Sequence, residues 1–267
     1  MKRILIHAGF HKTGTTSVQQ TLLHNTRTLR RNFQIFTRKN MTGACEAARS
    51  YSASRNMADL LVFTAEMTGV FEQVDVQDTR PVIISSEDLS GYMPGRRGLS
   101  TYSAAPILMK AITETANRVF NSQPELIFYF STREPQSWLR SCYAQHVRVI
   151  RITQTLEEYQ KEQAASADLG RIIDGVRLAV APHRVVASSL EDNAPRPLGP
   201  LAAVFDALSV PSKIRRRLSV LPPANVSLPQ ELLNEFLAAN QSDLDDATVA
   251  KAKTEARRIW LTGTADA

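Results

Sequence analysis

The chain of 267 residues is 43% hydrophobic and 22% charged, proportions that are ordinary for a soluble globular protein with one or two cores. Its formal net charge of +6 suits an anionic ligand, although a solvated basic surface gives the same balance. With only Cys45 and Cys142, the composition excludes a disulfide framework and a structural zinc site, and it favours a reducing compartment.

The chain begins with a pattern that predicts a strand, a glycine loop and a helix in succession. Residues 4–6 form a short apolar run, typical of a buried strand. Residues 9–16 contain two glycines and predict a tight loop, and from Thr15 onward apolar residues recur at helical spacing. Such a loop turns backbone N–H groups and the positive end of a helix toward an anion. The stretch therefore predicts a phosphate-binding loop, although a glycine turn that binds nothing has the same short pattern.

This loop is close to the Walker A motif G-x-x-x-x-G-K-[ST] but departs from it at the lysine. Gly9 and Gly14 have the required separation, whereas Thr15 stands where the motif has lysine. The lysine of this loop is Lys12, which precedes the second glycine. The charge of Lys12 would therefore approach a bound phosphate from a different side than the Walker A lysine of a nucleotide kinase does.

Short apolar runs alternate with segments of helical periodicity along the rest of the chain. Further strands are predicted at residues 33–36, 82–84, 125–131 and 184–188. Helices are predicted at residues 57–74, 104–121, 135–149, 200–209, 229–240 and 243–261, and residues 154–180 are predicted to be helical in two pieces. This alternation predicts an α/β fold with a central, mostly parallel sheet flanked by helices. We expect a single domain over residues 1–267, with the C-terminal helices of residues 228–262 packed on it.

Polar residues follow two of the predicted strands. Glu87 and Asp88 come shortly after the strand of residues 82–84, and Arg133 follows the strand of residues 125–131. Ser141 lies 8 positions after Arg133, about two turns into the next predicted helix, so that a guanidinium and a hydroxyl could meet on one phosphate. Ligands of such folds lie beyond the carboxyl ends of the strands, and we therefore expect these residues to share a site with the glycine loop.

The segment from His11 to Ser17, His-Lys-Thr-Gly-Thr-Thr-Ser, resembles the 5′-phosphosulfate loop of sulfotransferases. Those enzymes use 3′-phosphoadenosine 5′-phosphosulfate (PAPS), and their loop typically reads Pro-Lys-Ser-Gly-Thr-Thr, so that His11 here replaces proline. Arg133, Ser141 and Tyr143 are similar to the 3′-phosphate motif of the same family, which has an arginine after a strand and a serine eight residues later. The two motifs occur in the order that the family has, which strengthens each of them.

The resemblance implies a three-layer P-loop-type fold and a bacterial sulfotransferase-like enzyme that sulfates a hydroxyl of a carbohydrate or similar metabolite. The implied sulfuryl donor is PAPS, the implied acceptor is a small molecule or a glycan, and no metal is required. Lys12 would stabilise the negative charge that grows on the leaving bisphosphate. The implied donor-binding residues are Lys12, Thr13, Gly14, Thr15, Thr16, Ser17, Arg133 and Ser141.

Sulfuryl transfer to a hydroxyl needs a base that takes the acceptor proton. Glu87 resembles the glutamate that is the base in the glycan and protein-tyrosine branches of the family. Asp88 and His11 remain alternatives for this role, and His11 is also a candidate for contact with the leaving group. His7, which lies before the loop, is expected to be a packed histidine.

Two other classes of function stay open at this stage. A P-loop kinase would use ATP and magnesium, and the missing lysine after Gly14 argues against it. A non-catalytic nucleotide-binding module would keep the same cations and transfer nothing. We expect a cytoplasmic protein, because no segment approaches the ~20 apolar residues of a membrane helix and the first apolar run is too short for a signal peptide. No motif indicates nucleic-acid binding, and the oligomeric state stays open.

Overall fold

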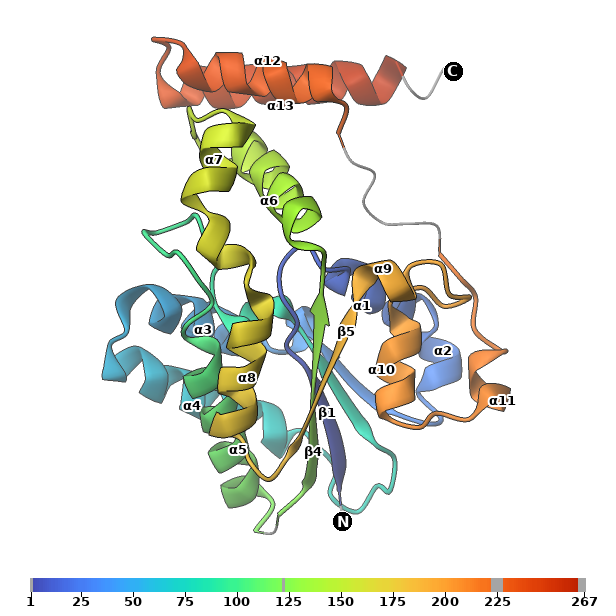
Figure 1. The fold of residues 1–267 in the computed structure, drawn as a ribbon. Coiled ribbons are helices and arrows are strands. Elements are labelled where there is room, and N and C mark those ends of the chain that lie inside the picture. The colour runs from blue at the N-terminus through green and yellow to red at the C-terminus, as the bar shows by residue number, and fades with distance from the viewer. Residues whose placement is uncertain (1, 122, 222–227, 264–267) are drawn as a thin grey trace. The chain divides into compact units, whose positions relative to one another are not determined.

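The computed structural model describes residues 2–121, 123–221 and 228–263, and these form two compact units (Figure 1). The first unit lies within Met1–Glu134 and Asp168–Ala224, and the second lies within Pro135–Ala167 and Asn225–Ala267. That the whole chain is a single domain stays a prediction.

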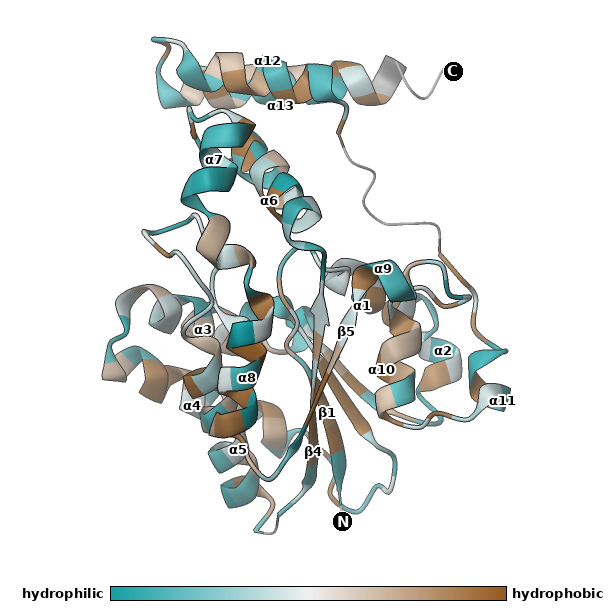
Figure 2. Cartoon of the chain, viewed as in Figure 1, coloured by the Kyte–Doolittle hydropathy of each residue, from teal (hydrophilic) through white to brown (hydrophobic). Residues whose placement is uncertain are grey.

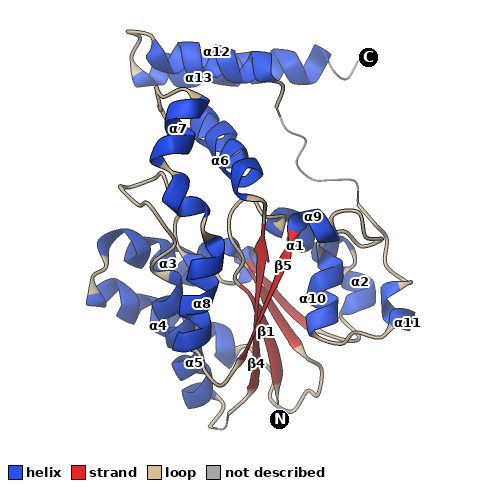
Figure 3. Ribbon diagram, in the orientation of Figure 1, coloured by secondary structure: helices blue, strands red, loops and turns tan. Residues whose placement is uncertain are grey.

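The first unit contains a parallel sheet of five strands with the order β2-β3-β1-β4-β5, drawn in red in Figure 3. The strands are β1 (Arg3–His7), β2 (Gln34–Thr37), β3 (Val82–Ser85), β4 (Glu125–Thr132) and β5 (Arg184–Ser189). Each predicted strand is confirmed to within one residue at either end. Because β1 is the central strand, the loop that follows it lies at the middle of the carboxyl edge.

Helices cover both faces of this sheet (Figure 1). One face carries α1 (Thr15–His24), α2 (Thr26–Leu29) and α10 (Leu201–Ala207), whose apolar side chains share a core with Leu5, Ile83 and Ile127. On the other side, α8 (Leu169–Ala179) packs on α5 (Ala105–Val119), followed by α4 (Met57–Glu72) and α3 (Thr42–Ser54). The predicted three-layer α/β fold with a parallel sheet is thus confirmed within the first unit.

The three inner strands β3, β1 and β4 are buried on both faces, which explains why each contains a continuous apolar run in the sequence, whereas the edge strand β5 is only partly covered. Ile4, Leu5 and Ile6 of β1 are completely buried, as are Val82, Ile83 and Ile84 of β3. The hydropathy colours of Figure 2 show the same concentration of apolar residues along the sheet. Removing a side chain of this size from such a core typically costs about 2–5 kcal/mol.

The second unit is helical and consists of α6 (Pro135–Val149), α7 (Leu156–Glu162), α12 (Gln230–Gln241) and α13 (Asp246–Gly263). α12 packs on both α6 and α13. Asn240 and Lys253 each donate to the carbonyl oxygen of Val147 near the end of α6, at 3.1 Å in both cases. These buried donors satisfy carbonyl groups that the helix itself leaves without partners.

The remaining elements are short: η1 (Arg38–Asn40), η2 (Glu87–Ser90), η3 (Ala164–Ala167), α9 (Leu190–Asn193) and α11 (Ser212–Arg215). Among the described residues, no helix has the length and apolar character that crossing a bilayer demands.

Candidate functional site

The loop between β1 and α1 contains three residues in the left-handed region of backbone space. These are Gly9, Lys12 and Gly14, with φ angles of 50°, 67° and 95°. A Cβ atom at position 14 would also lie 2.8 Å from Leu190 Cδ1, so a larger residue there would have to displace that half-buried side chain. Loops that alternate right- and left-handed residues form concave surfaces of N–H groups that bind anions. The left-handed lysine is rarer and costs about 1 kcal/mol or more, a strain that often accompanies function.

The first turn of α1 leaves its backbone N–H groups without a side-chain cap. Gly14 occupies the N-cap position, and no acidic residue lies in the first turn. The intrahelical hydrogen bonds begin at Val18, whose N–H donates to the Gly14 carbonyl oxygen at 3.2 Å. The amides of Thr15, Thr16 and Ser17 precede that bond, at the end of the helix that carries a partial positive charge. This end of α1 can therefore accept an anion.

Two buried hydroxyl groups fix the loop to neighbouring strand ends. Thr13 Oγ1 donates to the carbonyl oxygen of Phe10 at 2.7 Å and lies 2.6 Å from Ser131 Oγ in β4. Ser90 Oγ, shortly after β3, donates to the Gly9 carbonyl oxygen at 2.7 Å. The Thr13 side chain is completely buried and engaged in these contacts. Because the Thr13 hydroxyl is already engaged, the prediction that Thr13 binds the donor now applies to its backbone N–H group.

Arg133 lies against the loop, although 121 positions separate it from Lys12. Its Nη1 atom donates to the Lys12 carbonyl oxygen at 3.3 Å, and its Nε atom lies 3.9 Å from a carboxylate oxygen of Glu191. The fold thus brings two predicted donor-binding residues together at the carboxyl edge of β1 and β4.

Ser141, the predicted partner of Arg133, lies in the second unit. It is half-buried on α6, and nearby Tyr143 donates its hydroxyl proton to the carbonyl oxygen of Gln154 at 3.1 Å. That Ser141 and Arg133 hold one phosphate stays a prediction.

Glu87 lies beside α1. It begins η2 directly after β3 and Ser86, and its Oε2 atom accepts a hydrogen bond of 2.8 Å from Gln19 Nε2 on the second turn of α1. The side chain is half-buried. The Gln19 amide thus orients this carboxylate at the carboxyl end of β3, and a general base is recognised first by such placement.

Asp88 has a different environment, although it is the next residue. Its carboxylate is 7% exposed and lies 3.0 Å from Arg38 Nε, 3.7 Å from Arg49 Nη1 and 3.5 Å from His11 Nε2. Burial by itself would raise the pKa of Asp88, but the contacts with His11 and the two arginines outweigh it and hold the pKa below its usual value. A carboxylate stabilised in its charged form is a poor base, so the geometry favours Glu87 over Asp88 for that role.

His11 is held on both sides of its ring. Its Nδ1 atom lies 3.0 Å from the hydroxyl of Tyr102, which also accepts a hydrogen bond from the His11 backbone at 3.1 Å. Asp88 lies on the Nε2 side. Through these contacts His11 links the loop to Asp88 and the two arginines around it, Arg38 and Arg49. We call these residues, with Tyr102, the Asp88 cluster.

The residues that complete this cluster were missed by the sequence analysis. Arg38 follows the carboxyl end of β2, so the rule that directs attention to strand ends could have found it. Tyr102 is 1% exposed but belongs to a glycine-rich segment without periodicity, and Arg49 lies on an ordinary polar helix. Neither of these two carries a signal in the sequence.

His7, at the end of β1, is completely buried, as expected for a packed histidine. Its Nδ1 atom lies 2.9 Å from Ser85 Oγ in β3, and its Nε2 atom has no hydrogen-bond partner. Burial lowers the pKa of His7 to about 3, so the ring is neutral at physiological pH.

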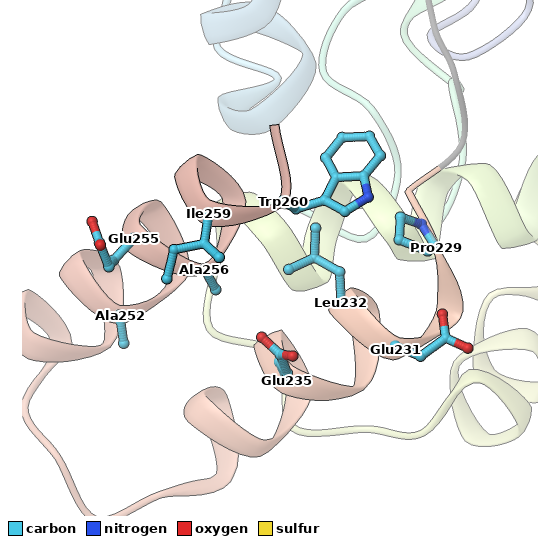
Figure 4. A pocket seen from close by; sticks show the side chains of 9 residues that line it. All are labelled: Pro229, Glu231, Leu232, Glu235, Ala252, Glu255, Ala256, Ile259 and Trp260. Atoms are coloured by element: carbon cyan, nitrogen blue, oxygen red, sulfur yellow. The ribbon is translucent and has the colours of Figure 1, made fainter. Parts of the chain in front are cut away.

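The described residues contain no group of three or more His, Cys, Asp or Glu side chains that could hold a metal ion. A groove of about 730 Å³ lies between α12 and α13 of the second unit (Figure 4). Its lining is apolar at Leu232, Ile259 and Trp260 and acidic at Glu231 and Glu235. The groove contains none of the predicted site residues.

No family model matches the chain, and no curated protein matches it significantly. Among solved structures, the chain is similar to the crystal structure of a sulfotransferase from Alicyclobacillus acidocaldarius. The two are 16% identical with a TM-score of 0.46, and the match covers 90% of this chain and 92% of that chain. A likeness at this level identifies neither a reaction nor a donor or acceptor for this chain.

Proposed function

We propose that this protein is a sulfotransferase that moves the sulfuryl group of PAPS to a hydroxyl of a carbohydrate or a similar metabolite. The observation that carries the proposal is the loop between β1 and α1. It combines left-handed residues at Gly9, Lys12 and Gly14 with an uncapped helix start, and its lysine lies inside the loop. Together with Arg133 at the neighbouring strand end, this arrangement suits a ligand with two separate phosphate groups.

In the proposed complex, the amides of Gly14, Thr15, Thr16 and Ser17 bind the 5′-phosphosulfate. The 3′-phosphate lies against the Arg133 guanidinium, whose planar donors match phosphate oxygens. Lys12 lies beside the oxygen that bridges phosphorus and sulfur.

The proposed reaction is an in-line displacement at sulfur. The acceptor oxygen forms a bond to sulfur while the bond between sulfur and the bridging oxygen breaks, which releases adenosine 3′,5′-bisphosphate. Glu87 takes the proton of the acceptor hydroxyl, and Lys12 stabilises the charge that develops on the bridging oxygen. Loss of one such cation typically lowers the rate by roughly two to three orders of magnitude.

The alternative with ATP as the ligand is disfavoured by one residue. The Walker A lysine that contacts the β- and γ-phosphates is replaced by Thr15, whose side chain is 2% exposed. A kinase with this loop would lack its main phosphate-binding cation, whereas a ligand with a 3′-phosphate gains one at Arg133.

Isothermal titration calorimetry without magnesium tests the proposal, with adenosine 3′,5′-bisphosphate and ATP as the two ligands. We expect the bisphosphate to bind much more tightly than ATP and Arg133→Ala to weaken it roughly 10- to 100-fold, since hydrogen bonds to charged groups contribute about 1.5–3 kcal/mol. Arg177→Ala is the matched control, because Arg177 pairs only with Asp174 on the exposed side of α8 among its described contacts. A preference for ATP, or equal effects of the two arginine variants, contradicts the proposal.

A further inference from the structure

The imidazole of His7 lies directly beneath the first glycine of the loop. A Cβ atom built on Gly9 would lie 3.2 Å from His7 Nε2 and 2.9 Å from Thr15 Oγ1. The imidazole nitrogen and the threonine hydroxyl therefore both lie close to the position that a Cβ of residue 9 would occupy, and glycine leaves that position empty. Because Gly9 has no side chain, the backbone of the loop can lie close to these two polar atoms.

The two polar atoms are poorly satisfied as they stand. His7 Nε2 is buried with no hydrogen-bond partner. The Thr15 hydroxyl donates to the Phe10 carbonyl oxygen at 3.3 Å, a long contact, and that same oxygen already accepts a 2.7 Å hydrogen bond from Thr13. A buried polar atom without a partner destabilises the folded state, and native proteins keep few of them.

The other side of the imidazole is fixed. His7 Nδ1 lies 2.9 Å from Ser85 Oγ, and the ring packs against that of Tyr129 with a centroid separation of 5.2 Å. When the Ser85 hydroxyl donates to Nδ1, the neutral ring carries its proton on Nε2 and becomes a donor on the side of the loop.

We propose that His7 is a positioning residue that orients the Thr15 hydroxyl toward an anion in the loop. In the bound state Ser85 donates to His7 Nδ1, His7 Nε2–H donates to Thr15 Oγ1, and the Thr15 hydroxyl donates to an oxygen of the bound phosphate in place of the Phe10 carbonyl. In this chain His7 and Thr15 each donate one hydrogen bond and accept one, so neither side chain remains without a partner. The inference rests on the proposed function only in requiring that the loop binds a phosphate group.

A double-mutant cycle on His7 and Thr15 tests this chain of hydrogen bonds, with calorimetric binding of adenosine 3′,5′-bisphosphate as the readout. His7→Asn keeps a polar atom near Nδ1 and removes Nε2, and Thr15→Val removes the hydroxyl while keeping the shape. We expect each single change to weaken binding about tenfold, as befits the loss of one hydrogen bond. Because His7 acts through Thr15, His7→Asn should change the affinity less than twofold in the Thr15→Val background. Effects that multiply in the double variant overturn the proposal.

Two further variants separate positioning from folding. His7→Gln places an amide nitrogen near Nε2, so we expect it to restore most of the affinity that His7→Asn loses, and a failure of this rescue contradicts the role of Nε2. His24→Asn, on the exposed end of α1, should leave binding unchanged. Thermal denaturation of each variant identifies any that does not fold, in which case Thr15→Val with His7→Gln supplies the comparison.

A second probe distinguishes failure of this inference from failure of the proposed function. If the wild-type protein binds inorganic pyrophosphate but not the bisphosphate, the donor assignment is wrong and the same cycle is measured with pyrophosphate. If the wild type binds the bisphosphate and the cycle shows no coupling, the inference about His7 is wrong while the donor assignment stands. Binding of neither ligand overturns both.

Discussion

The buried imidazole of His7 makes the stability of the first unit depend on pH in a way that one substitution removes. His7 is completely buried, and burial lowers its pKa to about 3 in the folded protein. In the unfolded chain the same side chain has a pKa near 6.5. We therefore expect His7→Gln, which keeps a polar side chain but cannot titrate, to flatten the dependence of the unfolding free energy on pH.

The sign and size follow from the two pKa values. Below about pH 6.5 the unfolded chain binds a proton at His7 that the folded protein does not, so acid favours unfolding. The contribution of His7 is fully present above pH 6.5 and is lost as the pH falls toward 3. Between pH 7 and pH 5 the loss is about 2 kcal/mol, at 1.36 kcal/mol for each pH unit below the unfolded pKa.

Urea denaturation followed by far-ultraviolet circular dichroism at pH 7, 6 and 5 measures this difference. Both tryptophans, Trp138 and Trp260, belong to the second unit, whereas circular dichroism includes the signal of the helices and strands of the first unit. Other titrating groups, such as Asp88, are present in both proteins and cancel in the comparison of wild type with variant. Unfolding free energies that fall in parallel between pH 7 and pH 5 would refute the reasoning, because they would mean that His7 is protonated or solvated in the folded protein.

Three further predictions concern the loop and the acidic residues Asp88 and Glu87. Gly9→Ala should weaken binding of adenosine 3′,5′-bisphosphate more than about tenfold in calorimetry, because the added Cβ atom would meet buried polar atoms at a φ angle of 50°. Gly69→Ala is the control and should leave the affinity unchanged, because a Cβ atom there has nothing within 4 Å. Asp88→Asn should lower the unfolding free energy by about 2 kcal/mol at pH 7, because it breaks the ion pairs of a buried carboxylate. Asp174→Asn, at an exposed ion pair, should lower it by less than about 0.5 kcal/mol, and equal losses in urea denaturation would contradict this prediction. Glu87→Gln should lower the rate of sulfuryl transfer to an identified acceptor at least about 100-fold while bisphosphate affinity stays the same, and an unaltered rate would remove Glu87 from the mechanism.

Local chemistry explains why the sequence predicts the fold so closely. An inner strand of a parallel sheet is buried on both faces, so it contains an uninterrupted apolar run such as residues 82–84, and such runs can be recognised without tertiary information. The loop is equally local, since the left-handed backbone at Gly9 and Gly14 needs glycine and the helix after it needs apolar periodicity. The approach of Arg133 to the loop follows as well, because the carboxyl ends of adjacent parallel strands lie at one edge.

The different environments of side chains with the same chemistry follow from long-range packing. Glu87 and Asp88 are neighbours with nearly identical titration in water, yet one lies beside α1 and the other among two arginines and a histidine, because successive residues of a 3₁₀ turn face different directions. The motif predicts Thr13 as a phosphate ligand, but its hydroxyl contacts Ser131 Oγ and holds the loop against β4.

The same reason applies to His7. An isolated histidine at a strand end has no signal that separates a packed ring from one that supports a loop. Burial, the Ser85 contact and the free Nε2 atom beneath Gly9 all come from residues of other strands or of the folded loop. Sequence thus determined the sheet, the loop and the ends at which polar residues gather. Long-range packing determined which of those polar atoms are charged, which are already paired and which still have a partner to gain.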